Sequence, residues 1–173
     1  MSILYPVQWP QFYTATCNEW LPLLDIDKYK NIIVDSLRFL VQEKRIELNA
    51  FAIMTNHLHL IWQAQPGYYP SQIQLSFMKY TAQQIKFELQ KDNPALLEKC
   101  KVNKADRQYQ IWRRDSLGVE LFTEAVFNQK IDYIHYNPVK AGLCKYPEVY
   151  HYSSAYFYEF GMDHFNMLTH FKG

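Results

Sequence analysis

The sequence predicts an α+β fold of the ferredoxin-like type, in which one face of an antiparallel sheet carries the helices. The predicted elements follow the order strand, helix, strand, strand, helix, strand, helix. Only two residues separate the two central strands, which implies an antiparallel hairpin. The length of 173 residues, of which 49% are hydrophobic, suits a single domain over residues 1–173. RNA-recognition modules share this layout, so the fold class alone leaves the function open.

The first half of the chain supplies the hairpin and its neighbours. Residues 7–17, VQWPQFYTATC, are rich in β-branched and aromatic side chains and predict a strand. Apolar residues recur at helical spacing over residues 27–43, which predicts an amphipathic helix. The segments IELNAFAIM and HLHLIWQ, residues 46–54 and 57–63, predict two strands joined by a turn at residues 55–56.

The next part of the chain predicts a helix and a short strand. The pattern Ser71-Gln-Ile-Gln74 is a capping box that opens a helix reaching to about Gln90. Residues 92–106 are expected to be irregular or loosely helical. Residues 110–122 are expected to hold a short strand, and the tail after Lys145 is aromatic.

Composition sets limits on location and partners. The formal net charge is +1, so the whole-chain charge does not call for nucleic acid, although a local patch could. Cys17, Cys100 and Cys144 lack the spacing of a metal finger or a redox motif, which favours a reduced, cytoplasmic chain. We expect no signal peptide, because the start MSILYPVQWPQ lacks a basic region followed by an apolar one, and no membrane contact, because no apolar run is long enough to cross a bilayer.

The run TNHLHLIW, residues 55–62, places two imidazoles inside an apolar segment. Alternate side chains of a strand share a face, so His57 and His59 should point the same way. Two imidazoles on one rigid face can bind one metal ion. They can equally be ordinary half-buried histidines, each satisfied by a hydrogen bond. Cupins also carry this pattern, but they need a glutamate soon afterwards and many strands.

The third predicted helix starts at residues 123–124 and is expected to end at Asn137, because Pro138 disfavours helical backbone at the residue before it. At 100° per residue, one apolar stripe should face the core: Phe127, Ile131 and Ile134. A different side of the helix carries Val126, Lys130, Tyr133 and Asn137, with Tyr133 and Asn137 as i, i+4 neighbours.

Two ordinary interpretations of that side stay open. Tyr133 is one of 14 tyrosines, most of which must be packing residues, and Tyr136 is a nearby competitor. Asn137 before proline is a common helix-ending choice. However, a phenol, an amide and an ammonium group lie together on a side of the helix away from the apolar stripe, which favours a catalytic or binding role for them. A phenol with a pKa of about 10 can attack a phosphodiester when a divalent metal polarises the phosphate.

The two motifs, in this order, resemble a known family. TNHLHLIW resembles the HUH motif of single-tyrosine transposases of the insertion-sequence type. IDYIHYNPVKAGL, residues 131–143, resembles the tyrosine-helix motif of the same family, especially its REP-associated branch. The resemblance implies the ferredoxin-like HUH nuclease domain. It also implies metal binding by His57, His59 and Asn137, with Mg²⁺ or Mn²⁺ as the ion, and Tyr133 as the nucleophile.

The resemblance further implies the reaction. Single-stranded DNA would be cleaved at hairpin-bearing ends through a transient 5′-phosphotyrosine bond, and the reverse step would rejoin strands. Lys130 is a candidate catalytic residue that would stabilise phenolate or phosphate charge. The alternatives are a replication-initiator or relaxase-type nickase and a non-catalytic nucleic-acid-binding protein on the same fold. A homodimer is possible in such a family. Thr55 departs from the proline that relatives often carry before the asparagine.

A basic segment over residues 99–114, KCKVNKADRQYQIWRR, is the predicted DNA contact. Its basic side chains supply phosphate affinity, and its aromatic side chains can stack on unpaired bases. The alternative is a solvated loop with buried aromatic residues. The candidate DNA-binding residues are Lys99, Lys101, Lys104, Arg107, Trp112, Arg113 and Arg114, with Lys79 and Lys86 as weaker additions.

Overall fold

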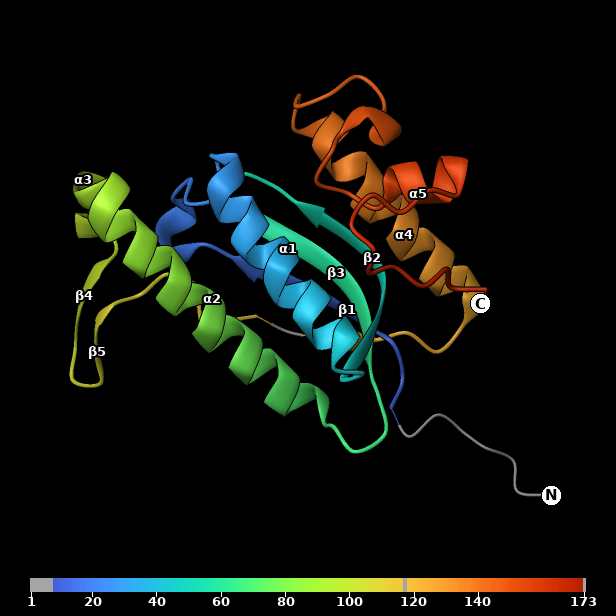
Figure 1. The fold of residues 1–173 in the computed structure, drawn as a ribbon, viewed down its shortest axis with the longest axis horizontal. Coiled ribbons are helices and arrows are strands. Elements are labelled where there is room, and N and C mark those ends of the chain that lie inside the picture. Colours follow the sequence, from blue (N-terminus) through green and yellow to red (C-terminus); the bar gives the residue numbers. More distant parts are fainter. Residues whose placement is uncertain (1–7, 117, 173) are drawn as a thin grey trace.

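A four-stranded antiparallel sheet forms the centre of the computed structural model, which describes residues 8–116 and 118–172 (Figure 1). Its strand order is β2-β3-β1-β6. The strands span Gln11–Thr16 (β1), Ile46–Ile53 (β2), His57–Ala64 (β3) and Gly118–Glu120 (β6). β3 runs antiparallel to both of its neighbours, and β1 runs antiparallel to β6. The predicted α+β class with an antiparallel sheet and a central hairpin is confirmed.

Two helices cover the first face of the sheet. α1 (Asp27–Gln42) and α2 (Pro70–Asp92) lie side by side across it (Figure 1). Alternate residues of β3, Leu58, Leu60 and Trp62, point into the main apolar core with them. The pleat therefore directs the intervening histidines to the opposite face.

A third long helix packs on that second face, so the expectation of helices on one face is wrong in this detail. α4 (Glu124–Lys140) buries its apolar stripe against Ala50, Ala52 and Ile61. Tyr158 of α5 (Ala155–Phe160) packs against the same cluster. The physical reason is that β2 and β3 carry apolar side chains on both faces, and each apolar face needs a cover.

α4 also ends later than predicted. It continues through Pro138 to Lys140, and Pro138 is buried. Pro138 has no N–H to donate to the Ile134 carbonyl, so the helix lacks one hydrogen bond there. The Asn137 carbonyl still accepts the Ala141 N–H at 3.0 Å. At the other end Thr123 caps the helix, with its side chain accepting from the Val126 N–H.

The segment after α2 is more ordered than predicted. A short α3 (Pro94–Glu98) leads into a hairpin of β4 (Lys101–Lys104) and β5 (Arg107–Tyr109). Figure 1 shows this hairpin beside α3, away from the four-stranded sheet. Two single 3₁₀ turns complete the elements, η1 (Asn18–Trp20) after β1 and η2 (Pro147–Val149) after α4.

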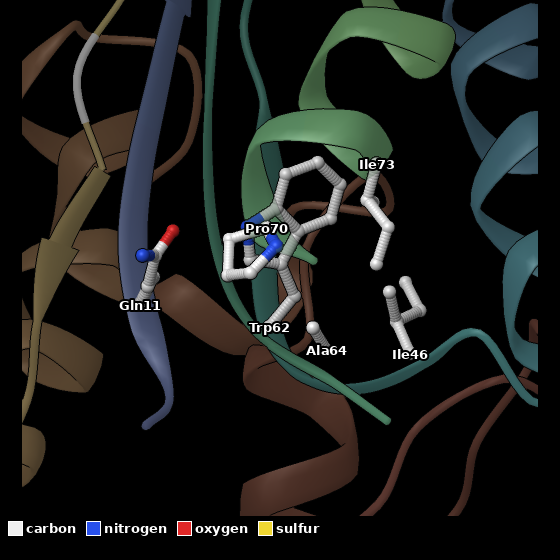
Figure 2. A pocket seen from close by; sticks show the side chains of 6 residues that line it. All are labelled: Gln11, Ile46, Trp62, Ala64, Pro70 and Ile73. Atoms are coloured by element: carbon white, nitrogen blue, oxygen red, sulfur yellow. The ribbon is translucent and has the colours of Figure 1, made fainter. Parts of the chain in front are cut away.

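The start of α2 closes one end of the main core. Figure 2 shows Pro70 and Ile73 against Trp62 and Ile46 around a small hollow. Its lining is apolar except for Gln11, and it lies at the end of β3 remote from the histidines. This hollow is a packing feature without reactive groups. Across residues 8–116 and 118–172, no helix is long and apolar enough to cross a membrane.

Candidate functional site

His57 and His59 lie next to each other on the second face of the sheet. Their ring centroids are 5.0 Å apart. In the β1–β3 ladder His59 lies opposite Thr14 and His57 opposite Thr16. His59 is buried, while His57 is partly exposed. The strand geometry expected from the sequence therefore holds.

α4 brings the polar side of the third predicted helix to these histidines. The Asn137 Oδ1 lies 3.2 Å from the His57 Nε2. The Tyr133 ring meets His59 edge-on at a centroid distance of 5.3 Å. Because Tyr133 is 45% exposed, a polymer in solution can reach its hydroxyl. Two segments far apart in the sequence thus contribute to one cluster, made of His57, His59, Tyr133 and Asn137.

Two contacts fix the position of α4 on the sheet. Its apolar stripe packs on β2 and β3. In addition, the buried His135 Nε2 lies 2.8 Å from the Ser154 Oγ, which also accepts the Phe51 N–H at 3.0 Å. His135 therefore connects the tyrosine helix to β2. This explains a histidine inside the YIHYNP run whose side chain contacts Ser154 and Tyr158.

Each imidazole of the pair has a polar neighbour at its Nδ1 atom. The His57 Nδ1 lies 2.7 Å from the Asn56 Oδ1, and the His59 Nδ1 lies 2.8 Å from the Thr14 Oγ1. An amide oxygen can only accept, so a neutral His57 donates from Nδ1 and keeps a lone pair on Nε2. The sequence indicated neither partner, because Asn56 has the pattern of a turn residue and Thr14 depends on strand register.

Burial keeps both imidazoles in the form that binds metals. Burial lowers the pKa of His59 to about 3, and the charges of His57 and Lys130 add to this. Burial also lowers the pKa of His57, and the Asn137 side chain partly opposes this because its oxygen favours the protonated ring. Both rings are therefore neutral near pH 7, and neutral imidazole is the metal-binding form.

The residues present fit a single divalent ion. Within residues 8–116 and 118–172, no group of three or more His, Cys, Asp or Glu side chains is placed to hold a metal. Two imidazoles and one amide oxygen are available instead. The His59 Nε2 is buried and has no hydrogen-bond partner in the described structure, a costly arrangement that a cation would relieve. The 3.2 Å between the His57 Nε2 and the Asn137 Oδ1 matches the separation of about 3 Å between adjacent ligands of an octahedral ion.

Lys130 contributes charge beside the phenol. Its Nζ lies 4.8 Å from the centroid of the Phe12 ring and 5.9 Å from that of Tyr133. Phe12 itself stacks on His59 and meets Tyr133 edge-on. Among the side chains described, the histidine rings contact Tyr133 and not Tyr136. The geometry therefore favours Tyr133 over its competitor.

In the folded chain, acidic side chains pair with several basic residues of the segment 99–114. Lys101 pairs with Glu98 at 2.9 Å, Arg113 with Asp115 at 2.6 Å, and both Arg107 and Arg114 with Asp106. Trp112 is 6% exposed, and its indole N–H donates to Thr81 inside the core. Trp112 lines a cleft beside α2, but at this burial its ring offers little surface on which a base could stack.

A cleft of about 820 Å³ lies between α2 and residues 106–116. We call it the basic cleft, since its lining includes Lys79, Lys86, Arg107, Arg113 and Arg114. Lys99, Lys101 and Lys104 are outside that lining, at the end of α3 and on the β4–β5 hairpin. The two lysines that the sequence ranked as weaker candidates thus join three of the predicted arginines.

Comparison with known families finds a similarity over part of the chain. The family described as IS200-like transposase matches residues 22–104. Over these residues the chain is similar to the IS200-like transposases. The matched part contains the TNHLHLIW run and ends before α4. The match agrees with the family that the sequence motifs suggested.

Solved structures show the same fold. A REP-associated tyrosine transposase bound to a REP hairpin has a TM-score of 0.64 and 17% identity, covering 98% of this chain and 91% of its own. A candidate transposase from Deinococcus radiodurans R1 has a TM-score of 0.51 and 15% identity, covering 78% of this chain and 94% of its own. At such identities the similarity concerns the fold. No curated protein matches the chain.

Proposed function

We propose that this chain is a metal-dependent enzyme that cleaves and rejoins single-stranded DNA through a covalent bond to Tyr133. One observation carries the proposal. An exposed phenol lies beside two neutral imidazoles and an amide oxygen, and one imidazole nitrogen is buried without a partner in the described structure. Packing alone does not account for a buried imidazole nitrogen without a partner, whereas cleavage of a phosphodiester needs a nucleophile and metal ligands side by side.

The His57 Nε2, the His59 Nε2 and the Asn137 Oδ1 would hold the ion. The amide oxygen and water are ligands that Mg²⁺ and Mn²⁺ take, and the two imidazoles make Mn²⁺ the better fit of the two, because Mg²⁺ prefers oxygen. When bound, such an ion supplies Lewis-acid polarisation of a phosphate oxygen. Thr14 and Asn56 orient the rings through their Nδ1 atoms, as the outer partners of metal-binding histidines commonly do.

Tyr133 performs the covalent step in this proposal. Its hydroxyl oxygen attacks the phosphorus and loses its proton, the bond from phosphorus to the 3′ oxygen breaks, and that oxygen takes up a proton. The products are a 5′-phosphotyrosine and a free 3′-OH. Attack by a 3′-OH reverses the step and restores the phenol, so no cosubstrate is consumed. The Lys130 ammonium group stabilises the negative charge that develops on the phenolic oxygen.

The substrate we propose is DNA with a hairpin next to a single-stranded segment. One similar structure is a tyrosine transposase bound to a REP hairpin. The basic cleft offers this chain a place for phosphates, because Lys79 and Lys86 line it. Which bases are read depends on contacts beyond the phosphate backbone.

The test is a covalent adduct. The protein is incubated with Mn²⁺ and end-labelled, hairpin-bearing single-stranded DNA, and the products are separated on a denaturing gel. We expect a protein–DNA band with the wild-type chain and with Tyr136→Phe, and none with Tyr133→Phe. EDTA and His57→Ala should each abolish the band. An adduct that persists in Tyr133→Phe would overturn the nucleophile assignment, and salt-sensitive binding without any adduct would favour a non-catalytic binding protein.

A further inference from the structure

An exposed indole stands next to the candidate metal site. Trp20, at the end of η1, is 56% exposed. Its ring meets His57 edge-on, with centroids 6.5 Å apart. Together with the histidine pair and Tyr133 it extends a row of rings, in the order Tyr133, His59, His57, Trp20. The indole is therefore the next ring along from the histidines on the side opposite Tyr133.

The backbone under Trp20 is strained. Glu19 and Trp20 have φ values of 56° and 54°, in the left-handed region that side chains other than glycine rarely occupy. The surrounding structure holds the turn in place. The Cys17 N–H donates to the Asn56 carbonyl at 2.8 Å, and the Asn18 N–H donates to the Ile111 carbonyl at 2.7 Å. Strain of this kind persists only where neighbouring structure imposes it, and it concentrates at functional sites.

The same neighbours tie the indole to both parts of the proposed DNA path. The Asn56 side chain, which contacts His57 through Oδ1, also approaches the Trp20 carbonyl through Nδ2 at 3.5 Å. The Arg113 guanidinium lies 5.5 Å from the centre of the indole, and Arg113 also lines the basic cleft. Asp115 pairs with Arg113 and holds it in that position. Trp20 thus lies between the metal site and the cleft.

We infer that Trp20 is a stacking platform for an unpaired nucleobase next to the phosphate that the enzyme cleaves. The inference rests on the proposed function and adds a base-binding residue to it. An exposed aromatic ring beside bound phosphate stacks any base, since every base has a π face. Arg113 on one side of the indole rigidifies the ring and leaves its remaining surface open. Trp112, which the sequence favoured for this role, is buried, and Trp20 is the tryptophan that the fold exposes at the site.

The experiment compares base-containing and base-free strands. A fluorescein-labelled oligothymidylate and an abasic oligomer of the same length are titrated by fluorescence polarisation in EDTA, so that metal coordination plays no part. We expect the wild-type chain to prefer the oligothymidylate. Trp20→Ala should weaken oligothymidylate binding about 5- to 100-fold and leave abasic binding unchanged. Trp20→Phe should keep most of the preference.

Trp9 provides the matched control, because it is 38% exposed but lies before β1, at the strand end remote from His57. Trp9→Ala should bind both oligomers like the wild type. Intrinsic fluorescence gives a second readout: oligothymidylate should quench it in the wild type and in Trp9→Ala, and not in Trp20→Phe.

Two results with Trp20→Ala would overturn the inference. One is a variant that retains the wild-type base preference, and the other is an equal loss of affinity for both oligomers, which would mean a structural role. If either occurs while the Tyr133 adduct still forms, only the stacking role falls. If the wild type binds neither oligomer and forms no adduct, the proposed function falls with it.

Discussion

At the scale of single residues, the side chains behind the two histidines decide how the histidines are used. Thr14 reaches His59 only because β1 and β3 pair in a register that places them opposite each other. Such a partner fixes which ring nitrogen carries the proton and how the ring is oriented. Because Thr14 occupies the Nδ1 of His59, the Nε2 of the same ring is left without a hydrogen-bond partner in the described structure.

Replacing Thr14 by valine should therefore weaken metal binding more than it weakens the fold. The substitution keeps the shape and removes the Oγ1 that contacts the His59 Nδ1. We expect Mn²⁺ affinity, measured by calorimetry on the DNA-free protein, to fall about 10- to 100-fold. Thr16→Val is the control, because Thr16 lies opposite His57 in the same strand and shows no side-chain hydrogen bond in the described structure. Equal losses in the two variants would contradict the positioning role of Thr14.

The sequence predicted those residues whose signal is local. His57 and His59 share a strand face, and Tyr133 and Asn137 share a helix side, so each pair follows from spacing alone. That the two pairs meet was an inference from the family resemblance. Thr14 and Trp20 could not be found in this way, because strand register and a strained turn leave no periodic pattern in the sequence.

At the scale of elements, α4 is the part that assembles the site. Its apolar stripe was predicted from the 100° periodicity, but the face of the sheet that receives it was not. Periodicity shows which side of a helix is buried and does not show against what. The helix also runs past Pro138, since a proline near the last turn removes only one hydrogen bond. This continuation keeps Asn137 inside the helix, one turn after Tyr133.

Ser154→Ala tests how far the site depends on the attachment of α4. The Ser154 Oγ contacts the His135 Nε2 and the Phe51 N–H, both in the interior. Its loss leaves buried polar groups without a partner, at a cost of about 1–3 kcal/mol in the free energy of unfolding. We expect urea unfolding to show this loss and the Tyr133 adduct to form more slowly. Ser76→Ala, which removes a contact within α2 only, should change neither measurement appreciably. An unchanged adduct rate in a destabilised Ser154→Ala chain would show that α4 is held by its apolar stripe alone.

At the scale of the whole molecule, charge is distributed unevenly although the net charge is only +1. The basic segment looked strongly positive in sequence, yet Glu98, Asp106 and Asp115 pair with much of it. A charge count over residues 99–114 misses Glu98 and Asp115, which lie just outside that range. The basic cleft gathers its charge from two segments instead, α2 and residues 106–116. Long-range placement of this kind is the part of the DNA-binding surface that local sequence cannot give.

Lys79 and Lys86 should therefore contribute more to DNA affinity than the lysines of the β4–β5 hairpin. Both line the basic cleft, and the Lys86 Nζ lies 5.2 Å from the centre of the Tyr109 ring. Removing one lysine that binds a phosphate should reduce the slope of log affinity against log salt by about 0.7 for a single strand. The Lys79→Ala, Lys86→Ala double variant should thus lower that slope by about 1.4, measured by fluorescence polarisation over a series of salt concentrations.

Lys91→Ala is the matched control on the same helix. Lys91 pairs with Glu88 at 3.6 Å, lies over the Phe87 ring and is outside the cleft lining. Its removal should leave the slope unchanged. A double variant with the wild-type slope would place the DNA path outside the basic cleft, and a matching reduction in Lys101→Ala, Lys104→Ala would move it to the hairpin.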